Sequence, residues 1–148
     1  MTETRLFVDT EFDGFGGPLM SMAIVSDSGH EWYEVLPTPV IRDKWVRENV
    51  FPVLGKKPIS MPEFRASLFA FLGIFENPII VADWYTDIVH FFQCFAGGDH
   101  TESHPYACRA ELVLIEDYES EVPHNALSDA RAIRVSYFNL DHSEESPW

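Results

Sequence analysis

RLFVDTEF, at residues 5–12, is an apolar, β-rich run that ends in two acids, which is typical of a central strand. The runs LMSMAIVS at 19–26 and EWYEVL at 31–36 have the same character. A Gly-rich turn at 13–18 and the turn Asp-Ser-Gly-His at 27–30 separate the three runs. The first third of the chain therefore predicts a three-stranded antiparallel meander.

The rest of the chain alternates helical and strand-like segments. The segment starting at Ser60 has the clearest start signal, because S-M-P-E combines a capping box with a proline in the first turn. Thr86 is the expected cap of the helix after the IIVA run. The expected helices span residues 42–50, 60–75, 87–95 and 126–138, and the expected further strands span 79–82 and 111–115. This order predicts an α/β fold whose mixed five-stranded sheet is flanked by helices.

Length and composition predict one domain with its own core. The chain has 148 residues, of which 46% are hydrophobic and 14% aromatic. We expect a single domain over residues 1–140, followed by an acidic tail at 141–148. No uninterrupted apolar run is long enough for a membrane span, and the amino terminus does not resemble a signal peptide. The sequence therefore predicts a cytoplasmic protein without a membrane partner.

The charge balance limits the ways in which the chain could bind nucleic acid. Ten Lys and Arg residues stand against 24 Asp and Glu residues, which leaves a net charge of −14. This acidity argues against tight non-specific binding to a duplex. It is compatible with an enzyme that contacts only a few terminal nucleotides, because bound cations cancel site carboxylates. The basic residues that could meet phosphates are Lys56, Lys57, Arg131 and Arg134.

Asp9 and Glu11 form the first candidate site. They lie two apart on the expected strand, so their side chains leave the same face. Two like charges this close raise each other's proton affinity, and a central strand rarely accepts them unless a cation lies between them. Taken alone, the pair is also compatible with two acids that have no function and are exposed to solvent at the end of a strand.

Three further acids and a histidine bear on the interpretation of this pair. Asp87 begins the helix after the IIVA strand, and Asp129 lies in the first turns of the last helix, where the helix dipole favours an anion. Asp83, directly after the same strand, competes with Asp87, and we prefer Asp87 for its place at the helix start. His124, on the loop that enters the last helix, suits a general base beside Asp129.

These residue types suit phosphodiester hydrolysis. The reaction requires neutralisation of a phosphate oxygen, a nucleophile formed near neutral pH and stabilisation of the leaving oxygen. Two divalent cations supply these effects. Mg²⁺ and Mn²⁺ prefer carboxylate oxygens, so the expected cofactors are two such cations.

Three motifs of this sequence resemble those of a known family. DTE at 9–11, the acid after the fourth strand and HNALSDA at 124–130 resemble the three motifs of the DEDDh exonucleases, in the DnaQ-like, ribonuclease H-like superfamily. The sequence DTEF with its Gly-rich turn, Trp45-Val46-Arg47 and residues 50–54 (VFPVL) are similar to small 3′ exoribonucleases related to ribonuclease T. The resemblance covers nearly the whole chain. In the second motif, Asp83-Trp84 replaces the His-Asn pair that commonly precedes the acid.

The resemblance implies a ribonuclease H-like fold and stepwise release of nucleoside 5′-monophosphates from single-stranded 3′ ends. It implies that Asp9, Glu11 and Asp129 hold one cation, that Asp9 and Asp87 place the second, and that His124 deprotonates the water.

The resemblance also extends to the substrate and the assembly. It implies that Phe12 contacts the terminal base, while Trp84 and Tyr85 are candidate stacking surfaces. RNA is the expected substrate in preference to DNA, although the sequence does not decide between them. Related ribonucleases suggest a homodimer.

Two other functions remain open from the sequence. The chain could be a non-catalytic acidic binding protein, or a nucleic-acid mimic, on a nuclease-like fold. Alternatively, the same centre could hydrolyse short oligonucleotides or free nucleotides, which would suit the acidity.

Overall fold

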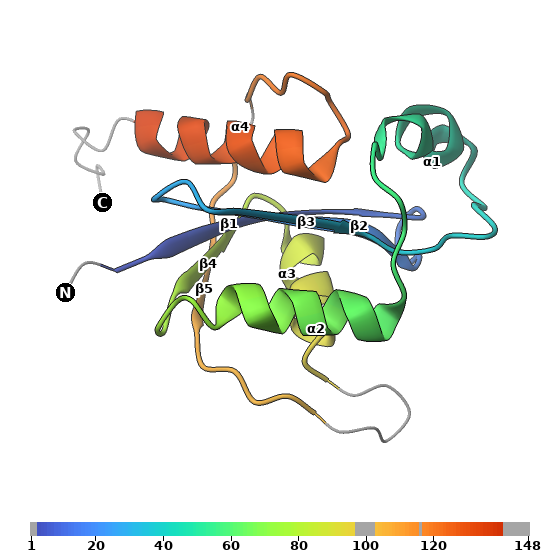
Figure 1. Ribbon diagram of the computed structural model, residues 1–148. Coiled ribbons are helices and arrows are strands. Elements are labelled where there is room, and N and C mark those ends of the chain that lie inside the picture. The colour runs from blue at the N-terminus through green and yellow to red at the C-terminus, as the bar shows by residue number, and fades with distance from the viewer. Residues whose placement is uncertain (1–2, 97–102, 116, 141–148) are drawn as a thin grey trace.

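Three antiparallel strands and two parallel ones form a mixed five-stranded sheet, as the sequence predicts (Figure 1). The computed structural model describes residues 3–96, 103–115 and 117–140, so the expected tail at 141–148 lies outside the described residues. The strand order in the sheet is β3-β2-β1-β4-β5. The strands are β1 (Arg5–Phe12), β2 (Leu19–Ser26), β3 (Glu31–Val35), β4 (Ile79–Ala82) and β5 (Arg109–Leu112).

Helices cover both faces of this sheet (Figure 1). Helix α4 (Ala126–Asn139) lies on one face, and α2 (Met61–Leu72) and α3 (Tyr85–Gln93) lie on the other. Along β1, Leu6 and Val8 join the core under α2 and α3, whereas Phe7 packs with Ile133 of α4. Strand alternation therefore directs the odd-numbered side chains of β1 toward α4. Within the described ranges, no helix has the length and apolar character needed to cross a bilayer.

Polar side chains fix where the helices begin. Ser60 and Glu63 form the predicted capping box at the start of α2. Asn125 caps α4 by accepting a hydrogen bond from the backbone of Ser128, and Asp43 caps α1 (Lys44–Asn49) in the same way. These caps satisfy backbone N–H groups that have no partner inside the helix.

The Gly-rich turn between β1 and β2 is hydrogen-bonded to the residues that lead into α1. The Asp13 carboxylate accepts hydrogen bonds from the backbone N–H groups of Arg42 (2.8 Å) and Asp43 (2.9 Å). Gly17 lies against this aspartate, because a Cβ at residue 17 would sit 1.8 Å from the carbonyl oxygen of Asp13. The close approach requires a glycine there.

Three local predictions were wrong. Thr86 does not cap α3, which begins at Tyr85, two residues before the expected start, follows the extended Trp84 and has no side-chain cap. Strand β5 spans Arg109–Leu112 rather than 111–115, because its pairing with Ile79 of β4 sets its register and the apolar run does not. The helix expected at 42–50 stops earlier and leads into a short 3₁₀ turn, η1 (Phe51–Val53), whose first turn accommodates Pro52.

Candidate metal centre

Asp9, Glu11 and Asp129 meet on the face of the sheet that α4 covers. A carboxylate oxygen of each lies within 4.8 Å of the other two. β1 supplies Asp9 and Glu11 two residues apart, and the first turn of α4 supplies Asp129. The pairing of β1 with β2 shifts register between Glu11 and Phe12, and such a bulge re-aims the side chains next to it.

A second group of three carboxylates shares Asp9. Carboxylate oxygens of Asp9, Asp83 and Asp87 also lie within 4.8 Å of one another. The sequence predicts Asp87 in preference to Asp83, whereas the structure brings both acids to Asp9. Asp83 is the first residue after β4, and Asp87 lies in the first turn of α3.

Thr10 holds Asp87 in this position. The Oδ1 atom of Asp87 accepts hydrogen bonds from the backbone N–H of Thr10 (3.1 Å) and from its hydroxyl (2.5 Å). Because Thr10 lies between the two acids of β1, the same strand positions carboxylates of both groups. The sequence carried a signal for this contact, since alternation points Thr10 to the face that α3 covers.

Burial makes the deprotonated forms of these acids unfavourable. It raises the pKa of Asp9 well above its usual value, and the nearby charges of Asp87, Glu11 and Asp129 add to the effect. Burial and the charge of Asp129 raise the pKa of Glu11 to about 9. The pKa of Asp87 rises to about 7, again mainly by burial, and the pKa values of Asp83 and Asp129 rise for the same reason. A bound cation would reverse this balance.

Two oxygen atoms test whether the centre fits a metal ion. Asp9 Oδ2 and Asp129 Oδ1 are buried, and within the part of the chain that the structure describes neither has a hydrogen-bond partner. A buried acceptor without a partner is unfavourable, and hard divalent cations take carboxylate oxygens as ligands. The residues of both groups could therefore hold a divalent cation, and its identity as Mg²⁺ or Mn²⁺ stays a prediction.

Known proteins add no assignment to this centre. No protein-family model matches the chain, and a search of curated proteins finds no match. Its chemistry has to be inferred from its own residues.

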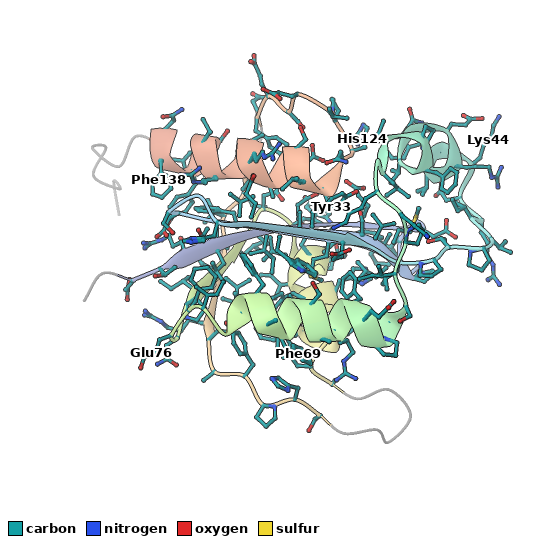
Figure 2. All side chains as sticks on the ribbon, viewed as in Figure 1. Tyr33, Lys44, Phe69, Glu76, His124 and Phe138 are labelled. Atoms are coloured by element: carbon teal, nitrogen blue, oxygen red, sulfur yellow. The ribbon has the colours of Figure 1, made fainter. Side chains whose placement is uncertain are left out.

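His124 lies at the edge of the first carboxylate group. Its backbone N–H donates to Asp129 Oδ2 at 3.2 Å, and its φ of 69° is in the left-handed region. Figure 2 shows His124 beside the end of α4 that is nearest to α1. Its ring packs edge-on against Trp45 of α1, with the ring centroids 4.8 Å apart. With Asp129, His124 lines a polar pocket of about 660 Å³.

The three residues predicted to touch substrate lie around the α3 side of the centre. Phe12 is half-buried and packs against His90 of α3, with ring centroids 4.8 Å apart. His90 borders a largely apolar pocket of about 490 Å³. Trp84 and Tyr85 are 52% and 47% exposed and contact one another at the start of α3. These three side chains are therefore available to a ligand next to Asp87.

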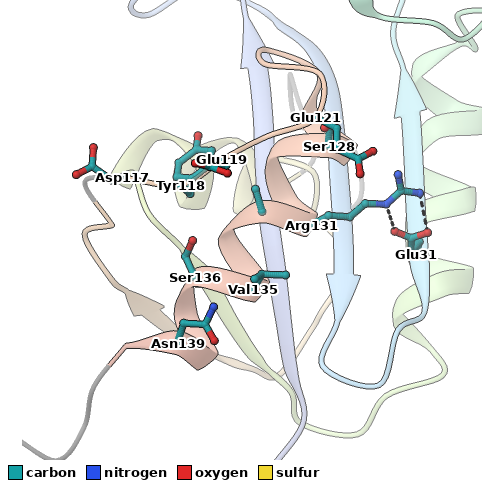
Figure 3. Close-up of a pocket in the computed structure, with 11 residues that line it drawn as sticks. Glu31, Asp117, Tyr118, Glu119, Glu121, Ser128, Arg131, Val135, Ser136 and Asn139 are labelled. Carbon is teal, nitrogen blue, oxygen red and sulfur yellow. Dashed lines mark hydrogen bonds and ion pairs between the residues drawn. The ribbon is translucent and has the colours of Figure 1, made fainter.

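Tyr118 is a site residue that the sequence analysis missed. Its ring packs against the apolar cluster around Phe7 and Tyr137, and it lines the same pocket as His124 and Asp129. Burial first, and then the charges of Asp9 and other site acids, raise its pKa. In Figure 3, Tyr118 lies on the irregular segment opposite α4. That segment has no periodicity from which its position could have been predicted.

Three of the four basic residues expected to meet phosphates have partners elsewhere, whereas Lys57 is exposed. Arg131 forms an ion pair with Glu31, as Figure 3 shows, and Arg134 donates to the carbonyl of Asp27 at 2.9 Å. Lys56 forms an ion pair with Glu34 at 2.9 Å. The structure therefore provides no basic track formed by these residues.

Proposed function

We propose that the chain is a metal-dependent 3′–5′ exonuclease with a ribonuclease H-like fold. It removes nucleoside 5′-monophosphates from single-stranded 3′ ends, of RNA in preference to DNA. The observation that carries this proposal is the pair of three-carboxylate groups that share Asp9. Two adjacent sites with one common ligand are what a two-metal nuclease needs. The mixed sheet, with three antiparallel strands followed by two parallel ones, is compatible with this fold.

In this proposal each carboxylate has a defined role. Asp9, Glu11 and Asp129 would hold one divalent cation, and Asp9, Asp83 and Asp87 would hold the other. The bound cations would neutralise the charge of the scissile phosphodiester and stabilise the oxygen that leaves. Thr10 keeps Asp87 in place through its two hydrogen bonds.

His124 is the proposed general base. It lines the polar pocket together with Asp129, whose Oδ2 accepts a hydrogen bond from the His124 backbone N–H. The imidazole takes a proton from water as the water oxygen bonds to phosphorus, the bond from phosphorus to the 3′ oxygen breaks, and the departing 3′ oxygen takes up a proton from solvent. The products are a nucleoside 5′-monophosphate and a strand shortened by one nucleotide with a new 3′ hydroxyl.

The aromatic residues beside α3 are the proposed contacts for the substrate end. His90 borders the apolar pocket and packs against Phe12, so the two rings offer a surface for the terminal base. Trp84 and Tyr85 offer exposed rings on which a second base can stack. Stacking needs no basic track, so it fits a net charge of −14.

The proposal is tested with purified protein and 5′-labelled, 3′-tailed RNA and matching DNA, in Mg²⁺, Mn²⁺ or EDTA. We expect a ladder of shortened products that depends on metal and disappears in Asp9→Asn. Glu76→Gln is a matched control, because Glu76 is an exposed acid outside both carboxylate groups and outside the pocket that His124 lines. If folded protein shortens neither strand with either metal, the exonuclease proposal is wrong.

A second candidate keeps the centre and changes the substrate to short oligonucleotides or free nucleotides. It is favoured by the ion pairs of Arg131 and Lys56, which leave these residues engaged with acids. The same assay separates the candidates when strands of about two to twenty nucleotides are compared at equal molar concentrations of strand. Rates that fall steeply with length would favour the second candidate.

A further inference from the structure

Trp45 is a large aromatic residue that the proposed mechanism does not use. It lies on α1 and is 52% exposed, whereas its neighbours Val46 and Val50 are buried in a core cluster. Its ring contacts His124, far away in the sequence. We infer that Trp45 is a positioning residue that holds the His124 imidazole in its working orientation. The inference rests on the proposed function, because it assigns a role in the same reaction.

The contact has the geometry of a specific aromatic pair. The ring centroids of Trp45 and His124 are 4.8 Å apart and the ring planes are inclined by 81°. Aromatic rings prefer such edge-to-face arrangements, because the positive edge of one ring meets the negative face of the other. Within the described residues, Trp45 is the only ring that packs against His124. The imidazole orientation therefore depends on this contact.

The backbone of His124 is fixed by other means. Its N–H donates to Asp129 Oδ2, and its left-handed φ of 69° turns the chain into α4. These constraints locate the Cα atom but leave rotation about the side-chain bonds open. A half-buried imidazole at the edge of a pocket therefore needs a side-chain contact to remain in one rotamer, and Trp45 supplies it.

The segment that carries Trp45 is tied to the same end of α4. Asn125, which follows His124, caps α4 and donates from Nδ2 to the carbonyl of Val53 in η1 at 2.8 Å. The hydroxyl of Tyr33 on β3 donates to the carbonyl of Leu54 at 2.6 Å. Because α1 leads directly into η1, these bonds hold α1 at a fixed position relative to the start of α4. The distance between the indole and the imidazole is thereby fixed.

The experiment measures single-turnover cleavage of 3′-tailed RNA with enzyme in excess, so that the maximal rate reports the chemical step. We expect Trp45→Ala to lower the maximal rate about ten-fold, with the half-saturating enzyme concentration changed less than about two-fold. Trp45→Phe keeps an aromatic edge and should restore most of the rate. Phe51→Ala is the matched control, because Phe51 is similarly exposed (53%) on the adjacent turn.

A double-variant cycle tests whether Trp45 acts through His124. In a His124→Ala background, Trp45→Ala should cause no further loss, because the group that it positions is gone. A second readout does not depend on activity: in NMR spectra of the metal-free protein, the indole ring current should shift the His124 ring protons. Trp45→Ala should remove that shift.

Three results would overturn the inference while leaving the exonuclease proposal intact. One is an unchanged maximal rate in Trp45→Ala beside an active wild type. Another is a higher half-saturating enzyme concentration with an unchanged maximal rate in Trp45→Ala, which would make Trp45 a stacking surface for a base. The third is a full additional loss in the His124→Ala background. A wild-type protein without activity would instead refute the exonuclease proposal, and this inference with it.

Discussion

Asp87→Asn tests whether the buried charge of Asp87 destabilises the folded protein when no cation is bound. Asp87 is 3% exposed, and its Oδ1 accepts both hydrogen bonds from Thr10. An asparagine keeps an oxygen acceptor at that position and removes the charge. In the absence of metal, the substitution should therefore stabilise the protein, although it removes a proposed ligand.

The magnitude follows from the pKa of this group. Burial raises the pKa of Asp87 to about 7, compared with about 3.9 in an unfolded chain. Between these values the native state binds more protons than the unfolded state, so stability falls as pH rises through 7. The difference of about three pH units corresponds to about 4 kcal/mol above pH 8, at about 1.4 kcal/mol per unit. At pH 5 the corresponding figure is smaller, about 1 to 2 kcal/mol.

The assay is urea unfolding in EDTA at pH 5 and at pH 8.5, followed by circular dichroism. We expect Asp87→Asn to exceed the wild type in free energy of unfolding by about 1 to 2 kcal/mol at pH 5 and by about 4 kcal/mol at pH 8.5. Excess Mg²⁺ or Mn²⁺ should stabilise the wild type more than the variant, because the cation binds the folded carboxylates. Asp117→Asn, at an exposed acid, should change stability by less than about 0.5 kcal/mol.

One outcome would refute this reasoning directly. If Asp87→Asn is less stable than the wild type in EDTA at pH 8.5, other interactions stabilise the buried Asp87 carboxylate, and the described contacts do not explain them. An advantage that stays the same between the two pH values would show that the group does not titrate in this window.

Three further substitutions test the framework around the centre. Gly17→Ala should lower the free energy of unfolding by at least about 2 kcal/mol, because its Cβ would meet the Asp13 carbonyl at 1.8 Å. Thermal unfolding beside Gly73→Ala, whose Cβ would come no closer than 3.4 Å to its neighbours, checks this. Asn125→Ala should cost about 1 kcal/mol by loss of the α4 cap, measured by urea unfolding, and unchanged stability would contradict the role of the cap. Leu68→Ala, at a fully buried core position, should cost about 2 to 5 kcal/mol in the same assay while leaving the single-turnover rate of the folded protein unchanged.

Features that depend on near neighbours in the chain were predicted well. The bounds of β1 and β2 agree with the alternation and turn signals, and the capping box at Ser60 begins α2 as expected. These signals work because strand alternation and helix caps involve residues only a few positions apart. The pair Asp9 and Glu11 was found for the same reason.

Features that depend on pairing between distant segments were not predicted. The edge strand β5 takes its register from β4, so its own apolar residues did not mark its ends. Helix α3 begins without a side-chain cap, since the hydrogen bonds from Thr10 to Asp87 and the packing of Phe91 hold it in place.

The sequence by itself determined the order of the elements and the residue types of the candidate centre, because both follow from local periodicity and composition. Only the tertiary structure decided that Asp83 and Asp87 both reach Asp9, and that Trp45 packs against His124. The physical reason is that these contacts join segments far apart in the chain. Their geometry is set by strand pairing and by helix packing on the two faces of the sheet, and no local pattern encodes either.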